Sequence, residues 1–222
     1  MPTAVLVSGG LDSTVLLAEE ARRDEAQPIY IRVGLAWEPA ERTIVARLLE
    51  TETVGGCRPL VSLAVDMSDV YDATHWAIQG QPPGYHTPDE DVYLAGRNVI
   101  LLAKAAVYCA AAHIGRLVIG TLAHNPFPDA TPEFRSTLAR ALSLGLAHPL
   151  EIAAPFADLS KSDVVRRGLA CGVALELTLS CMNPVGTRHC GRCSKCRERH
   201  DAFVETGVPD GTEYVDLRNV RA

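Results

Sequence analysis

The residues that decide the fold stand near the N-terminus: Ala4-Val5-Leu6-Val7-Ser8-Gly9-Gly10-Leu11-Asp12-Ser13-Thr14. The apolar run 4–7 predicts a buried strand, and residues 12–23 predict a helix. A strand that ends in Ser-Gly-Gly and leads directly into a helix places free backbone N–H groups beside the positive end of the helix dipole, which favours an anion. Gly9 and Gly10 lack a Cβ, so the backbone can approach a ligand closely.

The polar side chains of this loop indicate a phosphate ligand together with magnesium. Ser8 and Ser13 can donate hydroxyl hydrogen bonds, and Asp12 suits a phosphate site when Mg²⁺ bridges the acid and the phosphate. Neither the Walker A pattern GxxxxGK[ST] nor the pattern GxGxxG is present at this loop. The alternative is an ordinary Gly-Gly turn in which Asp12 or Ser13 caps the following helix.

The rest of the chain alternates between predicted strands and predicted helices. Strands are expected at residues 28–33, 59–65, 116–121 and 151–156, and helices at residues 39–53, 96–115 and 159–172. Gly115 and Gly172 are expected to end the last two helices, and Ser160 with Asp163 predicts a capping box. The Pro- and Gly-rich segment 80–91 predicts a long loop. This order predicts an α/β fold, a five-stranded parallel sheet with helices on both faces, and a ligand at the carboxyl ends of the strands.

Length and charge narrow the class of protein. The 222 residues fit one α/β domain over residues 1–172 and a C-terminal segment over residues 173–222. The formal net charge of −6 argues against general nucleic-acid binding. No apolar run reaches the roughly 18 residues that a membrane span needs, and no secretion signal is present. We therefore expect a soluble, cytoplasmic protein, and a homodimer is possible.

Four of the seven cysteines are concentrated near the C-terminus: Cys181, Cys190, Cys193 and Cys196. Two C-x-x-C units that share Cys193 are typical of a closed, tetrahedral structural zinc site. The alternatives are a redox-active pair, which needs only two cysteines, and an iron–sulfur cluster. The remaining cysteines, Cys57, Cys109 and Cys171, are expected to be small buried hydrophobic residues.

These motifs together resemble a known family. Ser8-Gly9-Gly10-Leu11-Asp12-Ser13 resembles the SGGxDS loop of the N-type ATP pyrophosphatases, which cleave ATP between the α- and β-phosphates and adenylate a carboxylate or carbonyl oxygen. In combination with the cysteine cluster, the chain resembles the 7-cyano-7-deazaguanine synthase (QueC) family. The segments that carry this resemblance are GRN at 96–98, PD at 128–129, PEF at 132–134, APFADLSKSDVVRRG at 154–168 and CGRCSKCRER at 190–199.

The resemblance implies an adenine nucleotide alpha hydrolase-like, Rossmann-like fold with an ATP pyrophosphatase domain and a small helical zinc-binding appendage. It also implies a cytoplasmic ligase that joins ammonia to 7-carboxy-7-deazaguanine and cleaves ATP to AMP and pyrophosphate, with Mg²⁺ and structural Zn²⁺. Pyrophosphate and magnesium would be held by Ser8, Gly9, Gly10, Asp12 and Ser13. Asp12, Ser13 and Lys161 would act in catalysis, with Lys161 on a phosphate.

The resemblance further implies that Arg97 and Asn98 face the site and that Asp129 and Glu133 lie near the deazapurine. Arg97 at a helix start is electrostatically unfavourable, which favours a ligand role. The plain alternatives are that Lys161 is an exposed first-turn residue and that Glu133 is a surface carboxylate.

The chain departs from the family at substrate-facing positions. The segment 33–38 has no YGQRH motif, and the segment 121–134 is shorter than usual. One alternative is therefore a QueC-like paralogue that adenylates the same or a related deazapurine acid and passes it to another amine, such as one on a protein. The others are a tRNA-modifying enzyme that adenylates a base and a nucleotide-binding module without turnover.

Overall fold

The computed structural model describes residues 2–54 and 56–220. It contains a five-stranded sheet of order β3-β2-β1-β4-β5, in which every neighbouring pair is parallel. The strands are β1 (Thr3–Leu6), β2 (Ala26–Arg32), β3 (Val61–Ala64), β4 (Arg116–Val118) and β5 (Glu151–Ala153). The predicted parallel α/β sheet is therefore confirmed, although each strand is shorter than, or shifted from, its predicted range.

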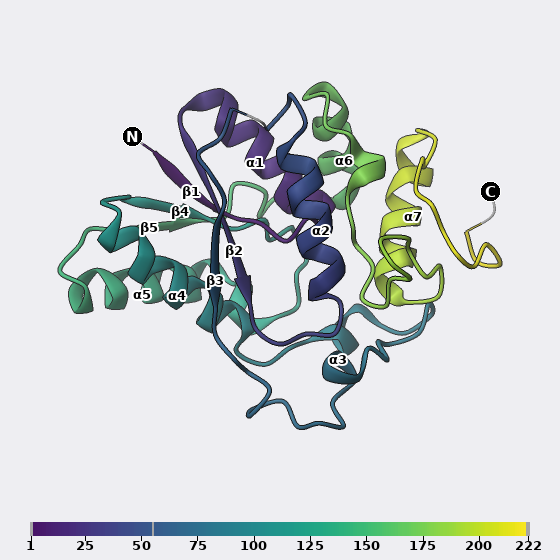
Figure 1. Cartoon of the computed structure of the whole chain (residues 1–222), viewed down its shortest axis with the longest axis horizontal. Helices are drawn as coiled ribbons and strands as arrows, with labels where there is room; N and C mark the ends of the chain where they lie inside the picture. Colours follow the sequence, from purple (N-terminus) through teal and green to yellow (C-terminus); the bar gives the residue numbers. More distant parts are fainter. Residues whose placement is uncertain (1, 55, 221–222) are drawn as a thin grey trace.

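Helices cover both faces of the sheet (Figure 1). The first face carries α1 (Leu11–Arg23), α2 (Glu38–Leu49) and α6 (Lys161–Ala170), and α7 (Ser194–Thr206) packs against α6 on that side. The second face carries α4 (Arg97–Ala111) and α5 (Pro132–Gly145). The shorter helices are α3 (Trp76–Gln79) and the 3-10 turns Asp89–Val92, Pro128–Ala130 and Leu175–Leu177.

Alternate residues of the central strand β1 pack into two different cores. Val5 belongs to the cluster on the α1 side, and Ala4 and Leu6 belong to the cluster on the α4 side. A parallel sheet that is covered on both faces needs apolar residues at consecutive positions, which explains the unbroken run at 4–7. Phe203 of α7 lies in the same cluster as Val5. The division of the chain at residue 172 stays a prediction.

Two predicted helix ends have different outcomes. The Ser160–Asp163 capping box of α6 is present, and Gly172 follows the helix with a left-handed φ of 66°. The predicted end at Gly115 is wrong, because α4 stops at Ala111 and the chain turns through His113 at φ 56°. The cause is that the apolar pattern continues past the last helical hydrogen bond into the turn before β4.

Helix α5 was not expected from the apolar pattern. Its start carries two helix signals, because Thr131 accepts a hydrogen bond from the Phe134 N–H at 3.1 Å and Pro132 occupies the first turn. Over residues 2–54 and 56–220, none of the helices combines the length and the apolar character that crossing a membrane requires.

The strand order reverses beside β1, and this places the site. From β1 the chain continues to β2 and β3 on one side, whereas β4 and β5 lie on the other side. Ligands of open α/β sheets bind where this reversal opens a crevice at the carboxyl ends of the strands. Here the crevice lies between Ser8, just after β1, and Gly120, just after β4.

Candidate active site

A cavity of about 440 Å³ occupies this crevice, a volume typical of small-molecule sites. The sequence-predicted residues that line it are Ser8, Gly10, Asp12, Ser13, Arg97, Asn98, Asp129 and Lys161. Gly9 is not among the lining residues but shapes the loop. Glu133 is exposed in the first turn of α5 and does not line this cavity. The structure therefore brings together all of the predicted polar side chains except that of Glu133.

The loop between β1 and α1 leaves the helix N-terminus open. Gly9 has a left-handed φ of 72°, and a Cβ there would lie 3.0 Å from Ile44 Cγ2. The Ser8 N–H donates to Ser13 Oγ at 3.2 Å, which folds the loop onto the helix start. Gly10 is the N-cap residue of α1 and receives no side-chain cap. The alternative in which Asp12 or Ser13 caps this helix is therefore wrong, and the first turn of α1, at Leu11, Asp12 and Ser13, lines the cavity.

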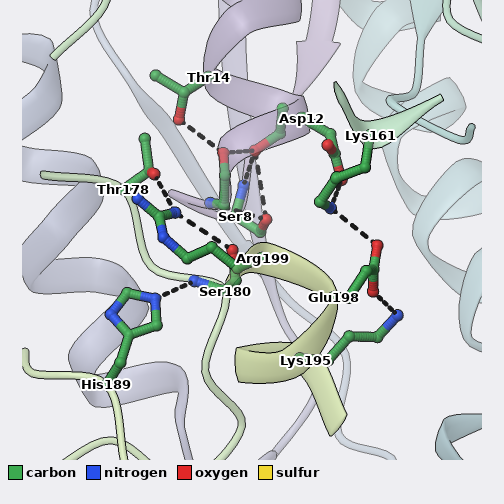
Figure 2. A network of polar contacts seen from close by, with 12 residues as sticks. Ser8, Asp12, Thr14, Lys161, Thr178, Ser180, His189, Lys195, Glu198 and Arg199 are labelled. Atoms are coloured by element: carbon green, nitrogen blue, oxygen red, sulfur yellow. Dashed lines mark hydrogen bonds and ion pairs between the residues drawn. The ribbon is translucent and has the colours of Figure 1, made fainter. Parts of the chain in front are cut away.

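Four charged side chains form a chain across the cavity wall (Figure 2). The Lys161 ammonium lies 2.6 Å from Asp12 Oδ2 and 3.1 Å from Glu198 Oε1. Lys195 Nζ lies 2.5 Å from the other oxygen of Glu198. The alternative of an exposed Lys161 is wrong, because this side chain is only 15% exposed. Sequence reasoning missed Lys195 and Glu198, both of which also line the cavity.

Burial and the neighbouring charges shift the pKa values of these linked side chains. Burial alone would lower the pKa of Lys161, but the Asp12 and Glu198 carboxylates outweigh it and the pKa is raised. Burial alone would raise the pKa of Glu198, but Lys161 and Lys195 lower it to about 2. Burial raises the pKa of Asp12, with Lys161 opposing that shift. Lys161 is therefore a cation at neutral pH.

Three polar atoms of the cavity wall are buried and have no hydrogen-bond partner among residues 2–54 and 56–220: Asp12 Oδ1, Arg97 Nε and Thr121 Oγ1. Buried polar groups in native proteins are nearly always paired, so such atoms need an explanation. Asp12 Oδ1 is an acceptor and suits a cation, whereas Arg97 Nε is a donor and suits an anion or a carbonyl oxygen. All three atoms lie where the loop, α4 and β4 converge on one cavity.

The start of α4 is fixed by Asp129. The Asn98 N–H donates to Asp129 Oδ2 at 3.0 Å, and the Asn98 amide donates to Oδ1 at 3.3 Å. Burial raises the pKa of Asp129, although the hydrogen bonds from Asn98 oppose that shift. Asp129 takes the place of a capping residue that Gly96, the N-cap of α4, cannot supply. Arg97 is thereby held at the cavity wall.

A second buried carboxylate, Glu41 of α2, lines the cavity on the β2 side. It accepts hydrogen bonds from Tyr30 Oη at 3.0 Å and from Trp37 Nε1 at 3.1 Å. Burial raises the pKa of Glu41 to about 7, although Arg97 and Tyr30 oppose the shift. Its neighbour Glu38 holds the preceding loop, where the family motif is missing, by accepting the Val33 N–H at 2.6 Å. Sequence reasoning missed Glu41, because nothing in its local pattern distinguishes it from a surface glutamate.

The four clustered cysteines are buried, and their sulfur atoms lie within 4.8 Å of one another. The Cys193–Cys196, Cys190–Cys196 and Cys181–Cys193 sulfur separations are 3.5, 3.9 and 4.0 Å. A tetrahedral ion with Zn–S bonds of about 2.3 Å places its sulfurs roughly 3.8 Å apart. The separations exceed a disulfide bond of about 2.05 Å, and an iron–sulfur cluster would hold its ligands farther apart. The donor set therefore fits one zinc ion.

Backbone N–H groups point at these sulfurs, as expected around thiolates. Cys190 N and Asn183 N lie 3.2 and 3.3 Å from Cys181 Sγ, and Arg192 N lies 3.4 Å from Cys190 Sγ. Such donors offset part of the negative charge that four thiolates carry. The residues that surround the cluster can thus hold a metal ion without a further ligand.

Fold and cavity together define a class: an α/β protein with a candidate anion site at the helix N-terminus after its first strand. Residues 3–207 match the model of the family described as queuosine biosynthesis protein QueC. This match spans most of the chain, which therefore belongs to the QueC family.

Curated relatives agree with this assignment over nearly their whole length. The chain is 32% identical to 7-cyano-7-deazaguanine synthase of Caldicellulosiruptor bescii, covering 96% of this chain and 97% of the relative. It is 33% identical to the synthase of Anaeromyxobacter dehalogenans, covering 95% and 94%, and 34% identical to that of Methanothrix thermoacetophila, covering 94% and 96%. These relatives are named as enzymes, and the chain is an enzyme of the same family.

Proposed function

We propose that this enzyme converts 7-carboxy-7-deazaguanine and ammonia to 7-cyano-7-deazaguanine, with cleavage of ATP to AMP and pyrophosphate. The relatives named above carry this synthase name. The observation that carries the proposal for this chain is the open N-terminus of α1 beside Lys161 and the unpartnered Asp12 Oδ1. N–H groups, an ammonium and a lone carboxylate oxygen in one cavity match a polyphosphate with its magnesium ion.

In the proposed first step, a carboxylate oxygen of the acid attacks the α-phosphorus of ATP, and the bond to the pyrophosphate oxygen breaks. The products are an acyl-adenylate and pyrophosphate. The first-turn N–H groups of α1, Ser8, Ser13 and Lys161 stabilise the charge that develops on the leaving pyrophosphate. Magnesium, held by Asp12, would supply further charge neutralisation when bound. The contribution of the chain is thus positioning and electrostatics.

In the second step, the ammonia nitrogen attacks the acyl carbon, AMP leaves, and a proton is lost to give the amide. A second ATP then adenylates the amide oxygen with release of pyrophosphate. Loss of AMP and of the remaining amide protons leaves the nitrile. No side chain is assigned as a nucleophile or as a general base.

The other site roles are part of the same proposal. Arg97, Asn98 and Asp129 would face the deazapurine acid, with the free Arg97 Nε as a donor to an oxygen of that acid. Glu133 would require a movement of α5 to reach the cavity, because it is exposed outside it. The cysteine cluster would hold structural Zn²⁺, and the substrates would be the acid, ATP and ammonia. A homodimer and a cytoplasmic location stay predictions.

The test supplies the acid, ATP, Mg²⁺ and ammonium, and identifies the products by mass spectrometry. We expect the nitrile, AMP and pyrophosphate from the wild type, and none of them from Asp12→Asn with its fold intact. Formation of ADP and phosphate would exclude the pyrophosphatase chemistry. Amide or adenylate without nitrile, in excess ATP, would exclude the synthase and favour the paralogue that uses another amine.

A further inference from the structure

Helix α7 starts within the cysteine cluster and also forms part of the cavity wall. Cys193 is its N-cap residue and Cys196 lies in its first turn. Lys195 and Glu198, three residues apart and therefore on one helix face, line the cavity. Figure 2 shows the Glu198 side chain between those of Lys161 and Lys195. The segment that would bind zinc therefore supplies two charged groups to the phosphate end of the cavity.

The contacts of Lys161 with the described part of the chain leave one N–H donor of its ammonium free. An ammonium has three N–H donors, and those of Lys161 meet Asp12 at 2.6 Å and Glu198 at 3.1 Å. The third is available to a ligand in the cavity. Lys161 is the first residue of α6, and its long side chain has many rotamers. Two carboxylates on different elements fix the ammonium in one place, whereas Asp12 alone would hold it only along one direction.

We propose that Glu198 is a positioning residue, which holds the Lys161 ammonium beside Asp12 so that its third donor points to the phosphates of ATP. This inference rests on the proposed function for the identity of the ligand. It goes beyond that function because it links the cysteine-bound helix to the adenylation site. Sharing of the ammonium between two carboxylates also leaves Asp12 Oδ1 free for magnesium.

The formal charges of these side chains distinguish a positioning role of Glu198 from a role in the electrostatic attraction of ATP. Asp12, Lys161, Lys195 and Glu198 sum to zero formal charge, so replacing Glu198 by a neutral residue leaves an excess of one positive charge. That excess attracts a polyphosphate. Loss of Glu198 should therefore not weaken ATP binding, and the cost should appear in the chemical step, where Lys161 must meet the leaving pyrophosphate.

Other contacts of residues 179–197 should keep the position of α7 unchanged when Glu198 is substituted. Leu179 N–H donates to Gly9 O at 2.8 Å, which joins the segment before Cys181 to the phosphate loop. Ser194 N–H donates to Pro83 O at 3.2 Å, and Arg197 donates to Asp89 at 2.7 Å. These bonds hold α7 in place when only the Glu198 carboxylate is changed.

The test is Glu198→Gln, with Asp201→Asn as the matched control. Asp201 lies on the same helix, is exposed and loses the same charge. We expect Glu198→Gln to lower kcat about tenfold, with the KM for ATP unchanged or lower, an unchanged KM for the acid and an unchanged zinc content. In single-turnover pyrophosphate formation on a Lys161→Met background, Glu198→Gln should cause no further loss, because it acts through Lys161.

A readout without turnover is the mobility of the Lys161 side chain, measured by NMR relaxation of its ε-carbon and assigned with Lys161→Met. It should rise in Glu198→Gln and stay unchanged in Asp201→Asn. Unchanged mobility and kcat, a raised KM for ATP at constant kcat, or an equal further loss on the Lys161→Met background would each overturn the proposal. If the wild type releases no pyrophosphate with the acid, the proposed function fails, and the mobility measurement alone decides the role of Glu198.

Discussion

Replacement of the buried Arg199 by methionine should destabilise the protein far more than the loss of an arginine at the surface. Arg199 of α7 is 0% exposed, and its polar partners lie in the segment before Cys181 and in the segment after α7. Its guanidinium donates to Thr178 Oγ1 at 2.7 Å, to Leu175 O at 2.7 Å and to Thr212 Oγ1 at 2.6 Å. Methionine retains part of the apolar stem but none of the donors.

The magnitude follows from what the substitution leaves behind. The Asp210 carboxylate, 10% exposed and 3.8 Å from Arg199 Nε, loses its cation. Removing one partner of a buried ion pair costs about 3–5 kcal/mol. Two features place the expected loss at the lower end. Thr178 still donates to Leu175 O at 2.6 Å, and Tyr214 Oη still donates to Asp210 at 2.7 Å. We therefore expect a loss of about 3 kcal/mol.

The assay is urea unfolding of the zinc-loaded protein, with Arg166→Met as the control. Arg166 is 52% exposed and pairs with Asp163 within α6, so its loss should change the free energy of unfolding by less than about 0.5 kcal/mol. A loss below about 1 kcal/mol for Arg199→Met would refute the reasoning that its three donors and its charge are both needed.

Three further predictions concern the cluster, a helix contact and pH. Cys193→Ser, or removal of zinc by a chelator, should lower Tm and turnover together, because Cys193 begins the helix that carries Glu198. Turnover that survives loss of the metal would contradict this prediction. Gly168→Ala should lower the free energy of unfolding in urea by about 1–3 kcal/mol, despite the better helix propensity of alanine. The reason is that the alanine Cβ would lie 2.7 Å from Leu175 Cδ2 and 2.8 Å from Val15 Cγ2. Equal or greater stability would show that these two side chains move aside at no cost. Burial raises the pKa of Glu41 to about 7, so the contribution of Glu41 to stability is fully present below the ordinary glutamate pKa and is lost as pH rises through 7. Glu41→Gln should therefore flatten the decline in the free energy of unfolding between pH 5 and 7.5. An unchanged slope would assign the decline to other groups.

The parts of the protein that sequence determined are those encoded by neighbouring residues. Alternation of apolar runs and helical periods predicts the parallel sheet, and Ser8 to Ser13 predict the loop and its open helix. The Ser160–Asp163 capping box and the cysteine spacing are likewise local signals. The capping box and the cysteine spacing depend on hydrogen bonds or ligand geometry within one short segment, so both can be recognised without knowledge of the packing. The sequence does not predict the end of α4, because the apolar pattern continues beyond the helix although the backbone turns at His113.

The tertiary structure alone decided which of these local features meet. Lys161 and Asp12 are separated by 149 positions in the chain and share one hydrogen bond. The addition of Glu198 to this pair depends on how α7 packs against α6, and Glu41 enters the cavity only through the orientation of α2 beside the loop. Glu133, the middle residue of the matching segment PEF at 132–134, faces solvent instead. Periodicity specifies the buried face of an element but not the partner that this face meets, because side-chain contacts between distant elements arise only when the layers pack together.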